Sequence, residues 1–166
     1  MLNLSPSLLI SRIITLIVAL TIHEFAHAFV AYRFGDTTAR DAGRLTLNPL
    51  KHLDVMGSLM LLVAGFGWAK PVPVNPYALR RRADSAMMWV SLAGPASNLL
   101  MAILAGVLLR LRVFPWVASD GFLPSPAEFL FTFMTINLVL MLFNLIPLAP
   151  LDGEKVLANL LPASWS

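Results

Sequence analysis

The fold is decided by residues 8–31, which read LLISRIITLIVALTIHEFAHAFVA. A helix needs about 20 mostly apolar residues to cross the hydrocarbon core of a membrane, which is about 30 Å thick. This run is long enough, and it carries His23, Glu24 and His27 toward its end. The sequence therefore predicts a membrane-spanning helix with a cluster of ionisable side chains.

The overall composition also favours a membrane protein. Of the 166 residues, 58% are hydrophobic and 13% are charged, whereas soluble domains have about 45–50% apolar and about 25% charged residues. This composition excludes an ordinary soluble domain and a disordered chain, which would be polar and rich in charge. The absence of cysteine excludes disulfides and thiolate metal ligands. We expect residues 1–166 to form a single domain, because the length suits one.

Other apolar runs complete the expected fold. Residues 86–111 and 127–146 are long enough to cross the membrane. Residues 53–77 join a short apolar run to a proline-rich stretch that cannot be helical, which predicts a re-entrant element. Residues 43–47 alternate polar and apolar side chains, which predicts a short β segment at the membrane edge. The expected fold is an all-α polytopic membrane protein with three core transmembrane helices, the re-entrant element and the β segment.

The basic residues predict the orientation, because cytoplasmic loops are enriched in Lys and Arg. If the first helix ends inside and residues 53–77 enter and return, nine basic residues lie on the inner side and three on the outer side. The inner nine are Arg33, Arg40, Arg44, Lys51, Lys70, Arg80, Arg81, Arg82 and Lys155. We expect these charges to contact lipid headgroups, with no nucleic acid as partner.

The sequence H-E-F-A-H at residues 23–27 has the pattern H-E-x-x-H. On a helix, positions i and i+4 share one face, so both imidazoles can reach one metal ion. Glu24 lies beside them and can take a proton from a metal-bound water. Ionisable groups inside a spanning helix are costly, and metal binding would compensate for that cost.

Catalytic zinc commonly has three protein ligands, so a third ligand must come from elsewhere in the chain. His52, the remaining histidine, lies beside Lys51 in a polar stretch, and we expect it to be solvated. Among the remaining acidic residues, Asp152 alone follows a long apolar run through a proline turn that could return a polar group to membrane depth. Spacing leaves two interpretations open for Asp152, a metal ligand or the cap of a short terminal helix.

Two motifs together resemble the site-2 protease family of intramembrane zinc metalloproteases. They are H-E-x-x-H in the first helix and N-L-I-P-L-A-P-L-D-G at residues 144–153, which matches the family pattern N-x-x-P-x-x-x-L/M-D-G. Residues 67–75 and 93–98 also resemble elements of bacterial members. The resemblance covers roughly residues 8–158.

The resemblance implies roles for particular residues. His23, His27 and Asp152 would bind one catalytic Zn²⁺, and Glu24 would be the general base. Asn144 would orient the substrate or stabilise the oxyanion. Asn98 is a candidate substrate contact, although residues 94–98 could simply allow close helix packing.

The chain departs from the family pattern in two places. Glu154 and Lys155 follow Asp-Gly where members commonly have a second glycine, and the chain stops 14 residues after Asp152. We therefore expect a minimal member or one truncated at its C-terminus, without an inserted PDZ-like domain.

The expected function is hydrolysis of peptide bonds in or near transmembrane segments of membrane-anchored proteins, in a prokaryotic plasma membrane, with the active site toward the cytoplasm. Further candidate substrate contacts are Leu45 and Leu47, through strand addition, and Pro71 and Pro73, as the lining of a polar cavity. Two alternatives remain, a membrane ion or metal transporter that uses the same buried groups and an inactive protease-like scaffold.

Overall fold

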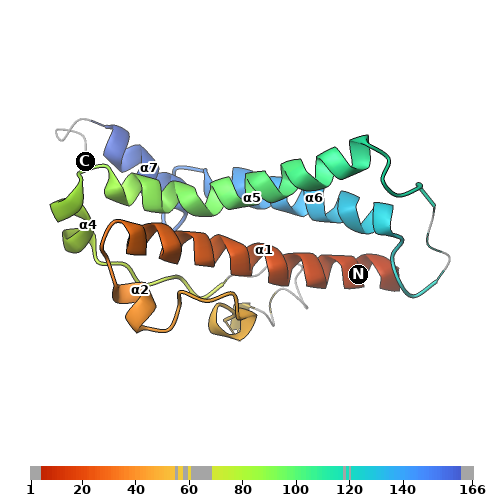
Figure 1. Cartoon of the computed structure of the whole chain (residues 1–166), viewed down its shortest axis with the longest axis horizontal. Helices are drawn as coiled ribbons and strands as arrows, with labels where there is room; N and C mark the ends of the chain where they lie inside the picture. The colour runs from red at the N-terminus through yellow and green to blue at the C-terminus, as the bar shows by residue number, and fades with distance from the viewer. Residues whose placement is uncertain are drawn as a thin grey trace.

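A computed structural model of the chain describes residues 5–54, 56–57, 60, 69–117, 119 and 121–161. Three long helices run side by side in it, α1 (Pro6–Arg33), α5 (Ala86–Arg110) and α6 (Pro126–Asn144) (Figure 1). Each is long and apolar enough to cross a membrane. The prediction of three spanning helices is confirmed by their length and composition. Every end of these helices lies within two residues of its expected position.

Capping side chains set where two of these helices begin. Ser5 Oγ accepts a hydrogen bond from the Leu8 amide at the start of α1. At the start of α6, Ser125 and Glu128 form a capping box, in which each side chain accepts a bond from the other residue's backbone amide. These bonds satisfy amides that have no partner within the helix.

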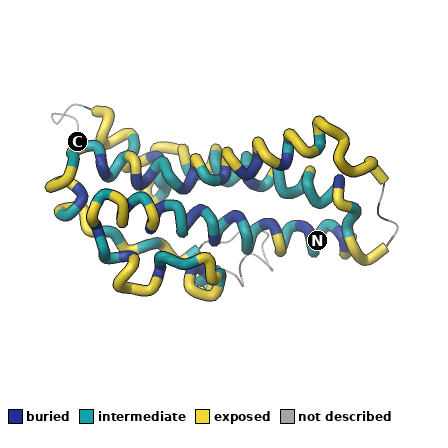
Figure 2. Tube along the Cα trace, viewed as in Figure 1, coloured by how far each residue is buried: buried dark blue, intermediate teal, exposed yellow. Residues whose placement is uncertain are grey.

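Helix α5 packs against both α1 and α6. Small side chains line the contacts, and Ala19, Ala28 and Ala102 are almost fully buried. Small residues let helix backbones approach closely, which favours helix association in lipid. Large apolar side chains of α5 such as Leu100 and Leu104 are instead exposed, on a helix whose outer side carries many exposed positions (Figure 2). An interior of small residues and an exterior of large apolar ones suits a bundle surrounded by lipid.

The chain between α1 and α5 runs in short pieces. These are α2 (Thr38–Asp41), the 3-10 helix η1 (Pro49–Lys51), an extended stretch at 70–75 and α4 (Pro76–Arg82). The proline-rich stretch is non-helical, as predicted. The re-entrant element predicted for 53–77 is not supported, and its central residues 61–68 lie outside the described part of the chain.

Residues 43–47 form no strand, so the predicted β segment is wrong. A strand needs a partner strand, and the hydrogen bonds here go elsewhere: the Gly43 and Arg44 amides donate to backbone carbonyls of α2. The Nε2–H of His52 donates to the Thr46 carbonyl at 2.7 Å. Arg44 is buried, and its side chain donates to the backbone carbonyls of Lys51 and Lys70.

His52 is fully buried, with 0% exposure, so the expectation that it is solvated is wrong. Besides the bond from its ring, its carbonyl accepts from the Lys70 amide at 2.7 Å. Nearby, the buried carboxylate of Asp36 accepts from the Asn75 amide at 2.6 Å. Together these bonds tie the extended stretch 70–75 to the loop that follows α1.

A turn after α6 returns the chain to the bundle. Helix α7 (Asp152–Leu160) follows and packs against α5. A Cβ at Gly153 would overlap the Leu145 carbonyl group and would lie 2.6 Å from the Ile146 oxygen. Glycine at position 153 therefore allows the first turn of α7 to lie directly against the end of α6.

Candidate metal centre

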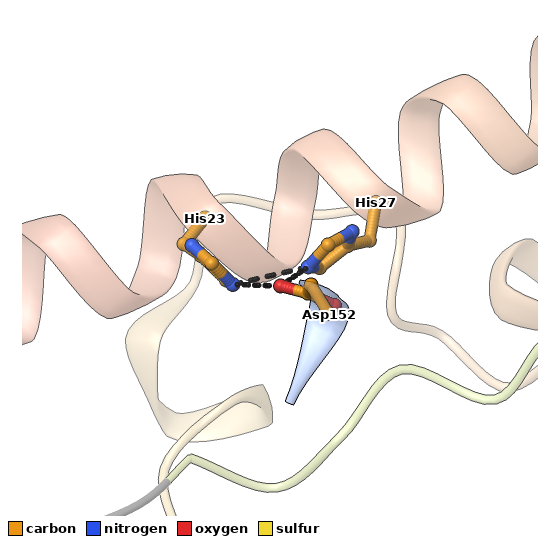
Figure 3. Close-up of side chains that lie close together, drawn as sticks. All are labelled: His23, His27 and Asp152. Carbon is orange, nitrogen blue, oxygen red and sulfur yellow. Dashed lines mark hydrogen bonds and ion pairs between the residues drawn. The ribbon is translucent and has the colours of Figure 1, made fainter. Parts of the chain in front are cut away.

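Three potential ligand atoms meet where the start of α7 faces α1 (Figure 3). The Nε2 atoms of His23 and His27, one turn apart on α1, are 3.0 Å from each other. Asp152 Oδ2 lies 3.2 Å from both of them. Both histidines are buried, and the Asp152 side chain is 12% exposed. The structure thus brings together the three residues that the sequence analysis named as metal ligands.

Asp152 does not cap the helix that it begins. The N-cap of α7 is Leu151, and no side-chain capping bond is present there. Of the two interpretations that spacing left open, the geometry favours the metal ligand.

A hydrogen bond at the far side of each histidine ring decides which ring nitrogen carries the proton. His27 Nδ1 lies 2.7 Å from the Val90 carbonyl oxygen, which can only accept, so this nitrogen carries the proton. His23 Nδ1 lies 2.6 Å from Asn98 Oδ1, which also accepts. Each Nε2 therefore presents a lone pair to the centre, as a metal ligand must.

The donor set fits zinc. Two imidazole lone pairs and one carboxylate oxygen at 3.0–3.2 Å repel one another unless a proton or a metal ion lies between them. Two histidines and one carboxylate are a known ligand set of catalytic zinc, and three protein ligands leave a fourth position for water or substrate. The three residues therefore fit a zinc ion.

Glu24 lies next to this centre but outside the group of ligand atoms. It is buried, and its Oε2 accepts a hydrogen bond from the Val72 amide at 3.2 Å. That bond links the stretch 70–75 to α1.

A cavity of about 410 Å³ opens onto the centre. Among its lining residues are the four motif residues just described together with Asn144 and Pro71. Asn98 lies behind His23, as its hydrogen bond requires. Pro73, Leu45 and Leu47 are not among the described residues that line the cavity, and Leu47 is 60% exposed. The roles suggested for these residues in substrate binding stay predictions.

Two residues that the sequence analysis did not single out shape the centre. A Cβ at Gly94 of α5 would lie 2.6 Å from His23 Nε2 and would overlap His27 Nε2. Asn137 of α6 is fully buried and accepts from Asn98 Nδ2 at 2.8 Å. A signal existed for Asn137, because an amide inside an apolar spanning helix needs a partner.

The fold and the site define a class of protein, a membrane-type metalloprotein with the ligands and the adjacent carboxylate of a zinc metalloprotease. Comparison with known proteins agrees. The chain is 48% identical over 157 residues to "Putative zinc metalloprotease YwhC" of Bacillus subtilis, which covers 94% of this chain and 71% of that protein. The chain belongs to this site-2 protease-like family of zinc metalloproteases.

Two mycobacterial relatives carry the same kind of name. Over 147 residues, the chain is 40% identical to "Putative zinc metalloprotease Rip2" of Mycolicibacterium smegmatis and 36% identical to the protein of that name from Mycobacterium tuberculosis. The chain spans 53% of the length of each. No family model and no solved structure matches the chain.

Proposed function

We propose that the protein is an intramembrane zinc endopeptidase that hydrolyses peptide bonds in or near transmembrane segments of membrane-anchored proteins. One observation carries the proposal. The lone pairs of His23 and His27 converge with the Asp152 carboxylate, while Glu24 lies beside them outside the ligand group. A protease needs such a carboxylate, next to the metal but free to act as a base.

In this proposal the metal and Glu24 divide the chemistry. A zinc ion held by His23, His27 and Asp152 would polarise a peptide carbonyl and lower the pKa of a coordinated water. Glu24 takes a proton from the attacking water and transfers it to the leaving amine. The Val72 amide donates to Glu24 Oε2, which holds the carboxylate beside the centre.

The substrate peptide binds in the cavity beside the metal centre. Asn144 and Pro71 line the cavity that contains the centre, which supports a role for Asn144 in orienting a peptide or stabilising the oxyanion. A transmembrane substrate hides its carbonyls in helical hydrogen bonds, and it must unwind locally before attack. The scissile bond then lies in a short unwound segment within this cavity.

The bilayer and transmembrane proteins are the proposed partners. Arg80, Arg81 and Arg82 end α4, which lies at the same end of the bundle as α7 (Figure 1). Basic residues near spanning helices favour the cytoplasmic side. We place the active site toward the cytoplasmic side of a prokaryotic plasma membrane.

The test compares wild type with Glu24→Gln, using purified protein, metal analysis and cleavage of a single-span membrane-anchored reporter. We expect both proteins to bind one equivalent of zinc. We expect Glu24→Gln to lose at least about 100-fold in cleavage rate, because an amide cannot accept the proton. His27→Ala, the matched ligand variant, should lose zinc as well as cleavage.

Other outcomes would contradict the proposal. Equal cleavage by wild type and Glu24→Gln would show that Glu24 is not the general base. Zinc binding without cleavage of any single-span reporter would favour an inactive scaffold. Zinc flux into vesicles that contain the protein, with no cleavage, would favour a transporter.

A further inference from the structure

A chain of hydrogen bonds runs from helix α6 through helix α5 to the metal-facing ring of His23. Asn137 Nδ2 donates to the Phe133 carbonyl at 2.9 Å. Asn98 Nδ2 donates to Asn137 Oδ1 at 2.8 Å, and Asn98 Oδ1 lies 2.6 Å from His23 Nδ1. Both amides are 0% exposed.

The direction of every bond in this chain follows from its first member. The Phe133 carbonyl can only accept, so Asn137 must turn its NH₂ toward it and its oxygen toward Asn98. Asn98 must then present its NH₂ to Asn137 and its oxygen to His23. The oxygen can only accept, so His23 Nδ1 carries the proton and Nε2 holds the lone pair.

The two histidines are held in different ways. The partner of His27 is the Val90 carbonyl, which is part of α5 and cannot exchange a donor for an acceptor. The partner of His23 is an amide, which can rotate by 180° and present its NH₂ instead. A rotated Asn98 would require a lone pair on Nδ1 and a proton on Nε2, the nitrogen that faces Asp152.

We propose that Asn137 and Asn98 are positioning residues that fix the tautomer of His23 and so keep its Nε2 lone pair available to the metal. The inference rests on the metal site of the proposed function. Among the described residues, Asn137 belongs neither to the ligand group nor to the residues that line the cavity. It acts through Asn98, because it prevents the rotation that would turn His23 into a poor ligand.

A structural role is the competing explanation, since an amide pair between α5 and α6 also joins two helices in lipid. The two roles differ in what can replace Asn137. A joining role requires a bond between the helices. A positioning role requires only that residue 98 offer an acceptor to His23, which a carboxylate does without help, because it has no N–H to present.

The experiment measures zinc affinity by chelator competition in full-length purified protein, for Asn137→Leu and for Asn98→Asp/Asn137→Leu. We expect Asn137→Leu to weaken zinc binding about 10-fold or more, the usual effect of losing a group that orients a ligand. The double variant should recover most of that loss. Thr135→Val is the control and should bind zinc like wild type. Thr135 is exposed on the same helix, and its hydroxyl donates to the Phe131 carbonyl of that helix.

A second measurement works without metal. The chain has three histidines, so ¹⁵N-histidine spectra of the apoprotein can report the His23 tautomer. We expect the Nδ1–H form in wild type and in the double variant, and a population of the Nε2–H form in Asn137→Leu. This readout keeps the test decisive if either variant is less stable.

The outcomes separate this inference from the function on which it rests. Wild-type zinc affinity in Asn137→Leu would overturn the inference and leave the protease proposal intact. A loss in Asn137→Leu that Asn98→Asp does not recover, with the tautomer unchanged, would also overturn it, in favour of helix joining. Absence of zinc binding by wild type would overturn both.

Discussion

At the scale of single residues, the metal centre depends on residue 94 being a glycine, which has no Cβ. Gly94 faces both imidazoles so closely that a Cβ there would overlap the His27 ring nitrogen. A helical glycine destabilises its helix by roughly 1 kcal/mol relative to alanine, so this position has a compensating role. The absent side chain lets α5 approach α1 and hold His23 and His27 against Asp152.

We predict that Gly94→Ala lowers zinc affinity by about 10-fold or more, because the displaced imidazoles can no longer both reach one metal ion. Chelator competition on purified protein measures the effect. The control is Gly106→Ala on the same helix, where the new Cβ would lie 3.3 Å from the flexible Met134 thioether. Equal zinc affinity in wild type and both variants would show that the close approach at Gly94 has no role in metal binding.

Single residues also show how far a sequence predicts a site. The pair His23 and His27 could be predicted because helix geometry fixes the relation between i and i+4. Asp152 lies more than a hundred residues away, so spacing left it as a ligand or a cap, and the family resemblance decided for the ligand. Asn137 was missed, because its partner belongs to another helix and no local pattern identifies that contact.

At the scale of elements, the metal centre joins α1 to α7, and the position of α7 depends on its contact with the end of α6. Gly153 makes that contact, since a Cβ would overlap the Leu145 carbonyl group. The carbonyl belongs to the backbone and cannot move as a side chain can. The residue after Asp152 therefore determines how far the carboxylate reaches toward α1.

We predict that Gly153→Ala reduces both zinc affinity and reporter cleavage, because the first turn of α7 must move away from α6 and carry Asp152 with it. Metal analysis and the cleavage assay measure the two effects. Gly121→Ala is the control, since no described atom lies within 4 Å of its Cβ position. Full zinc occupancy in Gly153→Ala would mean that the turn adjusts without moving the carboxylate.

Elements were predicted with unequal success for a physical reason. Residues 86–111 were correctly predicted as a helix, because hydropathy and length are properties of the segment itself. Residues 43–47 were wrongly predicted as a strand, because alternation shows which side chains share a face but not whether a partner chain exists. His52 was misjudged for the same reason, since its hydrogen bonds with the Thr46 carbonyl and the Lys70 amide do not follow from the residues beside it.

At the scale of the whole molecule, the ligands come from opposite ends of the described chain. His23 and His27 belong to α1, the first helix, and Asp152 begins α7, the last. A metal ion between them would join two elements that otherwise meet through α5 and α6. Binding to the native state alone stabilises it by RT ln(1 + [L]/Kd), which is about 2.7 kcal/mol at one hundred times Kd.

We therefore predict that removing zinc with a chelator lowers the melting temperature of the detergent-solubilised protein and that added zinc restores it. The zinc-dependent shift should shrink at acid pH, because protons and zinc compete for the same Nε2 lone pairs. His27→Ala should show no shift, because it lacks one ligand. Glu24→Gln should keep the full shift, since Glu24 lies outside the ligand group. A full zinc-dependent shift in His27→Ala would mean that zinc stabilises the fold from another site, and the joining of α1 to α7 by metal would be wrong.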